Sequence, residues 1–230
     1  PPVVPMAAAP PAVPLAAARA ALLRDIDSFG FHSAAAMGVG GFITTRIFPV
    51  VLFRNGDALL DVEGLAHPGG LAAHRDANAD DWTRWRRAAG ELQIESTKRD
   101  GAREWRKLHF QTTYQELPDG FRLDGRYRSL SGVGNLAMGG SQSVTVFSEY
   151  SFARDGSVRR GGGVGSTAAA GDVSTVTAQA APGQRGRYEV RGLTLQIRWD
   201  DGSTETRIIV ADPTDPKTGL WLDGVSYVRR

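Results

Sequence analysis

The stretch Gly186-Arg-Tyr-Glu-Val-Arg-Gly-Leu-Thr-Leu-Gln-Ile-Arg-Trp-Asp-Asp-Gly202 decides the fold that the sequence predicts. After Arg191-Gly192, every second residue is apolar, and these residues are Leu193, Leu195, Ile197 and Trp199. A period of two places the apolar side chains on one face of a β-strand and the polar ones on the other. We therefore expect a strand, a tight turn at Arg191-Gly192, a second strand and a turn at Asp201-Gly202.

The same pattern of alternating strands and glycine turns recurs along the chain. The dipeptides Asn55-Gly56, Asp155-Gly156 and Asp223-Gly224 each lie between alternating segments. Asn-Gly and Asp-Gly favour the two-residue turns that join antiparallel strands. The sequence thus predicts an all-β protein made of one or more antiparallel meander barrels, with one N-terminal helix.

An internal repeat indicates two similar β units. Residues 85–94 align without a gap on residues 188–197, and both segments end in Leu-Gln-Ile. An Asn-Gly or Asp-Gly turn precedes each segment and an Asp-Gly turn follows it. Each copy of a repeat is expected to form the same structural unit, so a repeat restricts the folds that a chain can adopt. We expect either one barrel built from both units or two small barrels in tandem.

Composition excludes several kinds of chemistry. The chain has 230 residues, of which 41% are hydrophobic, and a formal net charge of +2. Its arginines are spread along the chain, whereas proteins that bind nucleic acids concentrate them on one face, so no nucleic-acid partner is predicted. The absence of cysteine excludes disulfides, thiolate metal sites and cysteine nucleophiles. No apolar run reaches the ~20 residues of a membrane-spanning helix.

The N-terminal region differs from the rest of the chain. Residues 1–14 are rich in Pro and Ala and predict an extended arm. Residues 15–29 predict a helix, because Leu15, Leu22, Ile26 and Phe29 follow a helical spacing. The first residue is Pro, so a removed export signal or a trimmed chain is expected. We favour a periplasmic or secreted protein.

The remaining chain divides into a first β unit at residues 30–117 and a second at residues 118–230. A polar connection at residues 64–81 carries His67, His74 and Asp76. The spacing of these residues matches no zinc or calcium site. Neither a metal nor a cofactor is predicted.

Residues 121–230 resemble the lipocalin-like β-barrel domains of exported bacterial proteins. The resemblance lies in residues 150–156, in Gly186-Arg-Tyr188, in Leu193-Thr-Leu-Gln-Ile197 with Asp201-Gly202, and in a final short hairpin. It implies an antiparallel meander with a cavity for a small apolar ligand. The Gly-x-Trp signature of lipocalins belongs on the first strand, whereas Gly219-Leu-Trp221 lies near the last.

Catalytic patterns are weak in this sequence. No Gly-x-Ser-x-Gly motif is present. His109 is a candidate general base, but the sequence indicates no nucleophile for it to activate. Carboxylates on separate strands can meet to hydrolyse glycosides, and the candidates for this are Glu95, Glu104, Glu149 and Glu189. No catalytic residue is assigned.

The sequence therefore favours a binding protein over an enzyme. The first hypothesis is a carrier of a small apolar molecule in a barrel lined by inward aromatic side chains, namely Tyr150, Phe152, Tyr188 and Trp199. The alternative is an interaction module of a cell-envelope or extracellular assembly, which includes an oligomer of this chain. It would dock by strand addition through the N-terminal arm and the Gly-rich strand at residues 157–165. A hydrolase with dispersed carboxylates is the third.

Overall fold

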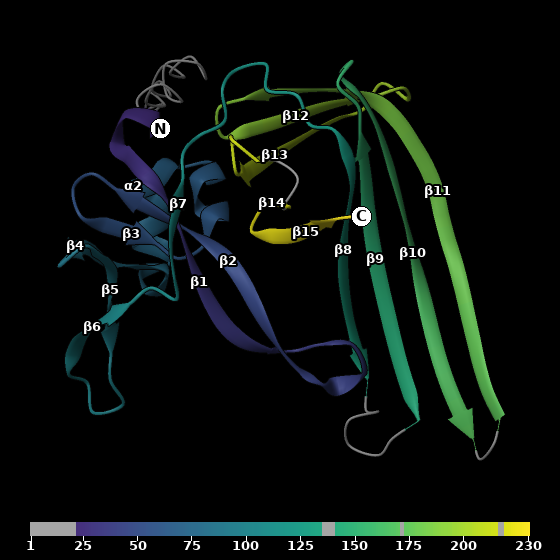
Figure 1. Cartoon of the computed structure of the whole chain (residues 1–230), viewed down its shortest axis with the longest axis horizontal. Helices are drawn as coiled ribbons and strands as arrows, with labels where there is room; N and C mark the ends of the chain where they lie inside the picture. The colour runs from purple at the N-terminus through teal and green to yellow at the C-terminus, as the bar shows by residue number, and fades with distance from the viewer. Residues whose placement is uncertain (1–21, 135–140, 171–172, 216–218) are drawn as a thin grey trace, which may run out of the picture.

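The computed structural model describes residues 22–134, 141–170, 173–215 and 219–230. Two β-sheets dominate it, and Figure 1 shows them side by side. Seven strands form an open sheet in the order β6-β5-β4-β3-β2-β1-β7, and eight form a closed antiparallel barrel in the order β10-β11-β12-β13-β14-β15-β8-β9. The predicted all-β barrel fold is confirmed.

The strands of the open sheet all precede residue 115. They are β1 (Ile26–Met37), β2 (Ile43–Phe53), β3 (Asp57–Leu59), β4 (Trp82–Ala88), β5 (Glu91–Thr97), β6 (Arg103–Lys107) and β7 (Phe110–Tyr114). Short 3-10 helices lie at η1 (Val39–Gly41), η2 (Val62–Ala66) and η3 (Ala79–Asp81). Helix α2 spans Gly70–Ala77. The connection predicted as a loop at residues 64–81 is therefore mostly helical turns.

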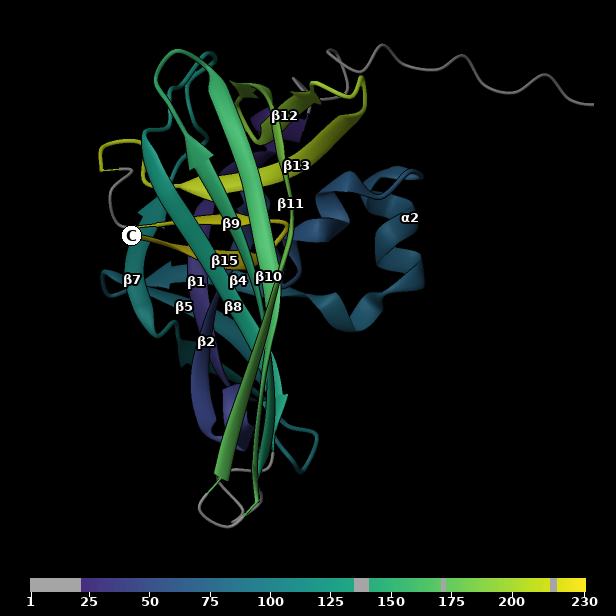
Figure 2. The same cartoon turned by 90° about the vertical axis from the view of Figure 1, so that its right-hand side faces the viewer.

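The barrel strands all follow residue 124, so the sheet contributes no strand to the barrel. They are β8 (Gly125–Gly134), β9 (Gln142–Phe152), β10 (Ser157–Ala170), β11 (Val173–Arg191), β12 (Thr194–Trp199), β13 (Thr204–Ala211), β14 (Leu220–Leu222) and β15 (Val225–Arg229). Strands β8 to β11 run well beyond the shorter β12 to β15 (Figures 1 and 2).

The predicted N-terminal helix is wrong for residues 26–29. Residues 22–25 are helical, but β1 begins at Ile26, and residues 15–21 lie outside the described residues. The apolar spacing of Leu22, Ile26 and Phe29 fits a helix, yet pairing with β2 and β7 supplies the backbone hydrogen bonds of this segment. Tertiary pairing overrides a local helical pattern in such cases.

The aligned segments of the internal repeat form hairpins with the same register. Trp85 pairs with Ile94 between β4 and β5, and Tyr188 pairs with Ile197 between β11 and β12. The N–H of Trp85 donates to the carbonyl of Gly56 at 2.9 Å, and the N–H of Tyr188 donates to that of Gly156 at 2.8 Å. The aligned sequences therefore have the same strand pairing and the same contact with the preceding turn.

The two sheets pack against each other through an apolar interface. It combines residues of the sheet such as Phe31 and Val51 with Leu193 and Val210 of the barrel. The indole nitrogen of Trp221, on β14, donates to the carbonyl of Ile47 at 3.0 Å. This interface fixes the barrel on one face of the sheet.

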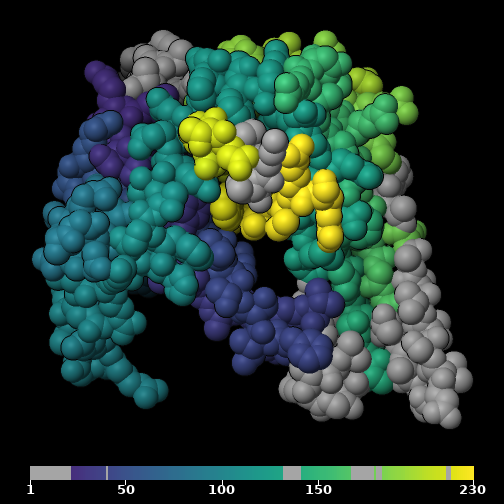
Figure 3. All heavy atoms as spheres, in the orientation of Figure 1, coloured from purple at the N-terminus to yellow at the C-terminus, as the bar shows by residue number. Residues whose placement is uncertain are grey.

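A second contact between the two parts lies at the far end of the molecule. The β1–β2 hairpin reaches away from the sheet, and η1 at its tip lies against β8 and β9. Figure 3 shows an opening bordered by this hairpin, by β14 and β15, and by the barrel strands. The barrel, the sheet and the hairpin thus surround a gap.

Candidate functional site

The four residues predicted to bind a ligand lie together in the core of the barrel. Tyr150 and Phe152 are stacked with ring centroids 5.7 Å apart, and Phe152 meets Tyr188 edge-on at 5.0 Å. Trp199 belongs to the same cluster, and all four side chains are buried. These rings contact one another, so they fill this part of the barrel as a packed core.

The hydroxyl of Tyr188 is bound to the backbone. It accepts a hydrogen bond from the N–H of Leu123 at 2.8 Å and lies 2.9 Å and 3.1 Å from the carbonyl oxygens of Leu123 and Ala153. Burial raises the pKa of Tyr188 above its usual value. Its polar atom is thus used to hold the connection into β8 and the β9–β10 turn.

A charged cluster borders the aromatic core, centred on Glu205 of β13. The first carboxylate oxygen, Oε1, accepts hydrogen bonds from the Tyr150 hydroxyl at 2.8 Å and from Arg207 Nε at 2.7 Å. The second oxygen, Oε2, accepts from Arg160 at 2.7 Å and from the indole nitrogen of Trp199 at 3.1 Å. Two of the four predicted residues therefore hold this carboxylate.

Electrostatics in the cluster keep Glu205 ionised. Burial raises the pKa of Glu205, but hydrogen bonds from Arg207 and Tyr150 and the charges of both arginines outweigh it, so the pKa lies below its usual value. Burial and the neighbouring carboxylate raise the pKa of Tyr150 to about 12. A carboxylate whose two oxygens accept four hydrogen bonds is a poor general base. The cluster therefore joins β13 to β9, β10 and β12.

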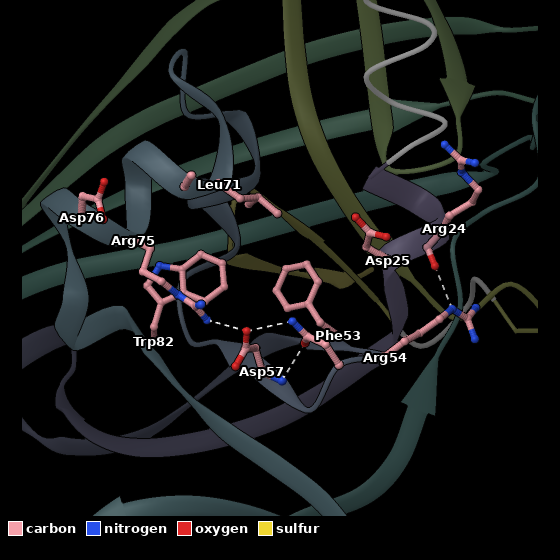
Figure 4. Close-up of a pocket in the computed structure, with 11 residues that line it drawn as sticks. Arg24, Asp25, Phe53, Arg54, Asp57, Leu71, Arg75, Asp76 and Trp82 are labelled. Carbon is pink, nitrogen blue, oxygen red and sulfur yellow. Dashed lines mark hydrogen bonds and ion pairs between the residues drawn. The ribbon is translucent and has the colours of Figure 1, made fainter.

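A ligand-sized cleft lies outside the barrel, between α2 and the turn that joins β2 to β3 (Figure 4). Its volume is about 560 Å³, within the range of small-molecule sites. Phe53, Leu71 and Trp82 supply its apolar surface, while Arg54 and Arg75 lie among its polar groups. Sequence reasoning did not identify this cleft.

Aromatic and charged side chains of the cleft hold one another. The Arg75 guanidinium lies 4.2 Å from the ring centroid of Trp82 and pairs with Asp57 at 2.7 Å. Phe53 stacks on the same ring at 5.6 Å. Arg54 donates to the carbonyl of Arg24 at 2.9 Å, and its side chain is 62% exposed. The cleft thus offers an apolar surface beside a largely exposed cation.

A smaller hollow of about 320 Å³ lies between the β1–β2 hairpin and the β14–β15 turn. Ala34 to Ala36, Arg46 and Phe48 line one side, and Gly224 and Val225 line the other. It adjoins the contact between the barrel and the sheet.

Histidines near the cleft have structural contacts. His74 is buried, and its Nδ1 accepts a hydrogen bond from the indole nitrogen of Trp82 at 3.1 Å. The rings of His67 and His74 are 5.5 Å apart. Among the described residues, no group of three or more His, Cys, Asp and Glu side chains is placed to hold a metal ion.

The four strand-borne glutamates considered for hydrolysis are not brought together. Each of them forms an ion pair with nearby arginine or lysine side chains: Glu95 with Arg103, Glu104 with Lys98 and Arg106, Glu149 with Arg126 and Arg128, and Glu189 with Arg191. His109 lies in the bend between β6 and β7. None of these contacts joins two of the glutamates.

Comparison of the chain with known protein families, with curated proteins and with solved structures finds no match. In the described part of the chain, no helix has the length and apolar character needed to cross a membrane. The function must therefore be argued from the geometry.

Proposed function

We propose that the protein is a non-catalytic binding protein for a small, mainly apolar molecule. The observation that carries this proposal is the cleft beside Trp82, whose 560 Å³ volume and mixture of aromatic, aliphatic and guanidinium groups suit such a molecule. The apolar part of the ligand would lie on Phe53, Leu71 and Trp82. A polar or anionic end would face Arg54.

The packing of the barrel core supports a site outside it. Tyr150, Phe152, Tyr188 and Trp199 contact each other or Glu205, and displacing them would expose buried polar atoms. The resemblance to lipocalin-like domains predicts a ligand inside the barrel. Such a ligand would bind further along β9 and β10 from the Glu205 cluster, beside the paired residues Val146 and Val164. These two side chains face the same side as Tyr150 and are each about half exposed.

Native mass spectrometry of gently purified protein tests the proposal, together with titration of an apolar fluorescent sulfonate dye. Ala72 is exposed and lines the cleft, so A72F should fill it and abolish binding. A77F places the same ring at the exposed end of α2, outside the cleft, and should bind normally. Binding that survives A72F but is lost in V164F would place the ligand in the barrel.

A second candidate is the interaction module, which the exposed hairpin tip favours. Met37, Phe42 and Ile43 are 62%, 57% and 81% exposed at the end of the β1–β2 hairpin. Exposed apolar groups gathered at one place mark interaction sites. The Gly-rich strand β10 is paired on both sides, by β9 and β11, so a partner could contact its face but could not extend the sheet there. The N-terminal arm lies outside the described residues.

Light scattering separates this candidate from the carrier. Deletion of residues 1–14, or the pair F42S and I43S, should convert a discrete oligomer into monomers if the protein is an interaction module. A monomer in both the parent protein and the variants would exclude self-association through these segments.

A further inference from the structure

Besides Arg191, the outer wall of the barrel carries four exposed arginines on three neighbouring strands. They are Arg159 on β10, Arg185 and Arg187 on β11, and Arg198 on β12. Most other arginines of the described residues contact a carboxylate, as Arg128 contacts Glu149 and Arg191 contacts Glu189. No ion pair joins any of these four to a carboxylate in the described part of the chain. We call these residues the arginine face.

The strand register brings these like charges together. Arg159 lies directly opposite Arg185, and Arg187 lies opposite Arg198. Arg185 and Arg187 are two residues apart on one strand and so point to the same side. Like charges in directly opposed positions destabilise a sheet. The charges of Asp155 and Glu189 act on Arg187 and Arg198 and offset part of this repulsion. An anion bound between the guanidinium groups would offset the rest.

The internal repeat supplies a reference for these positions, because Ser157 pairs with Arg187 as Asp57 pairs with Arg84. In the open sheet, Arg84 has the Asp57 carboxylate at 3.7 Å, and the residue aligned with Arg198 is Glu95. The residues aligned with Arg159 and Arg185 are Leu59 and Trp82, which pack in the apolar interface. The same strand pairing thus places a carboxylate opposite Arg84 in one unit and a serine opposite Arg187 in the other.

The neighbours of the arginine face restrict the kind of partner. None of the exposed large apolar side chains among the described residues lies on this side of β10, β11 or β12. Bases of single-stranded nucleic acid need aromatic platforms, and insertion into a lipid surface needs apolar side chains. Beside Arg159, Gly161 leaves open space along β10. The face therefore suits a hydrophilic chain of closely spaced anions.

Guanidinium groups bind phosphate oxygens through paired N–H donors, which lysine cannot reproduce. Four of them spread over three strands, ~4.8 Å apart from strand to strand, require a partner with high linear charge density. We propose that the arginine face binds a linear phosphate polymer without bases, of the inorganic polyphosphate type. This site is independent of the cleft beside Trp82.

Fluorescence titration with labelled long-chain polyphosphate at low and physiological salt tests the proposal. One variant, D155N/S157D/R198E, copies Asn55, Asp57 and Glu95 of the open sheet. A second, R159Q/R185Q, removes two cations of the face and leaves Arg187 and Arg198. The control R99E alters an exposed arginine in the β5–β6 turn, and all three variants change the net charge by −2. Circular dichroism and thermal unfolding confirm that each is folded.

We expect the two variants of the face to bind about tenfold more weakly or worse, and R99E to bind like the parent protein. Affinity of the parent protein should also fall steeply as salt increases. An equal loss in R99E would show that only net charge matters and would overturn the proposal. So would the absence of polyphosphate binding, or tighter binding to single-stranded RNA or to anionic lipid vesicles.

Discussion

The barrel and the open sheet share one hairpin geometry but differ in closure. In the barrel, β15 pairs with β8 and β14 joins β13 to β15. In the sheet, β7 pairs with β1 in the place of β15, but no strand corresponds to β14, so β6 and β7 remain edges. One additional strand separates a closed barrel from an open sheet.

The interior of the closed barrel is also larger than that of the open sheet. Among the described residues, sixteen buried side chains form the barrel core, against six in the equivalent cluster of the sheet. At equivalent positions the barrel has Tyr150 and Phe152, and the sheet has Val50 and Leu52. Eight strands enclose a space that side chains can fill. The comparison shows that larger interior side chains and the additional strand occur together.

The largest expected effect compares Ile197 with its equivalent, Ile94. Ile197 is fully buried among the aromatic rings of the barrel, whereas Ile94 is 6% exposed in the smaller cluster. I197A should reduce the free energy of unfolding by about 3–5 kcal/mol, and I94A by about 2–3 kcal/mol. Denaturant unfolding followed by tryptophan fluorescence measures both. A larger loss in I94A would mean that the open sheet contains the more stable core.

The next effect concerns Glu205, whose carboxylate accepts four hydrogen bonds at the border of the barrel core. E205Q should cost about 2–4 kcal/mol, because the amide is uncharged and its NH2 group cannot accept two of the four hydrogen bonds that the carboxylate accepts. The pKa of Glu205 is lower in the folded than in the unfolded protein. The stability that it contributes is therefore present above the unfolded value of 4.5 and is lost as pH falls below it.

Unfolding curves recorded from pH 7 down to pH 3 provide the measurement. The parent protein should lose stability steeply below pH 4.5, and E205Q should show a shallower decline. Glu189, whose carboxylate is nearly half exposed and pairs with Arg191, provides the matched control E189Q. If E205Q and E189Q gave the same pH dependence, Glu205 would contribute nothing specific.

A smaller effect comes from the polar atoms of the two aligned aromatic residues. Y188F removes the hydroxyl that accepts from the buried N–H of Leu123, at an expected cost of about 1–3 kcal/mol. W85F removes the indole N–H that donates to the carbonyl of Phe53 at 2.7 Å, at about 1 kcal/mol plus a loss of packing. Thermal unfolding measures both. Equal stability of Y188F and the parent protein would show that water replaces the hydroxyl.

Much of the fold was predictable because turn chemistry and strand period are local. Asn55-Gly56 and Asp155-Gly156 lie in the turns of two hairpins. Gly56 and Gly156 both adopt a φ of 85° there, a conformation that glycine accepts without strain. Leu195 and Ile197 are buried, as their alternation indicated. The helix predicted at residues 15–29 is wrong for residues 26–29, because the contacts that decide the structure of this segment come from β2 and β7, distant in sequence.

The candidate site was less predictable for the same physical reason. Inward-facing aromatic residues look alike in sequence whether they line a cavity or pack on one another, and Tyr150 and Phe152 pack. The cleft depends on α2 lying over Trp82, which brings Arg75 to Asp57 across 18 residues.

The smallest expected effect tests the charge difference between the two units directly. D155N/S157D transfers Asn55 and Asp57 of the sheet to the barrel without changing the net charge. In the sheet, the N–H of Asp57 donates to the Asn55 side chain at 2.9 Å, as the N–H of Ser157 donates to Asp155 at 2.8 Å. The turn should therefore keep its geometry.

A carboxylate at position 157 lies opposite Arg187 and offsets its repulsion with Arg198. The variant should gain about 0.2–1 kcal/mol in free energy of unfolding at low salt. Near 1 M salt the Debye length falls to about 3 Å, so the gain should disappear. Denaturant unfolding at both salt concentrations measures it. A variant that is no more stable than the parent at low salt would show that the four arginines do not repel one another, so that a bound anion would relieve no repulsion.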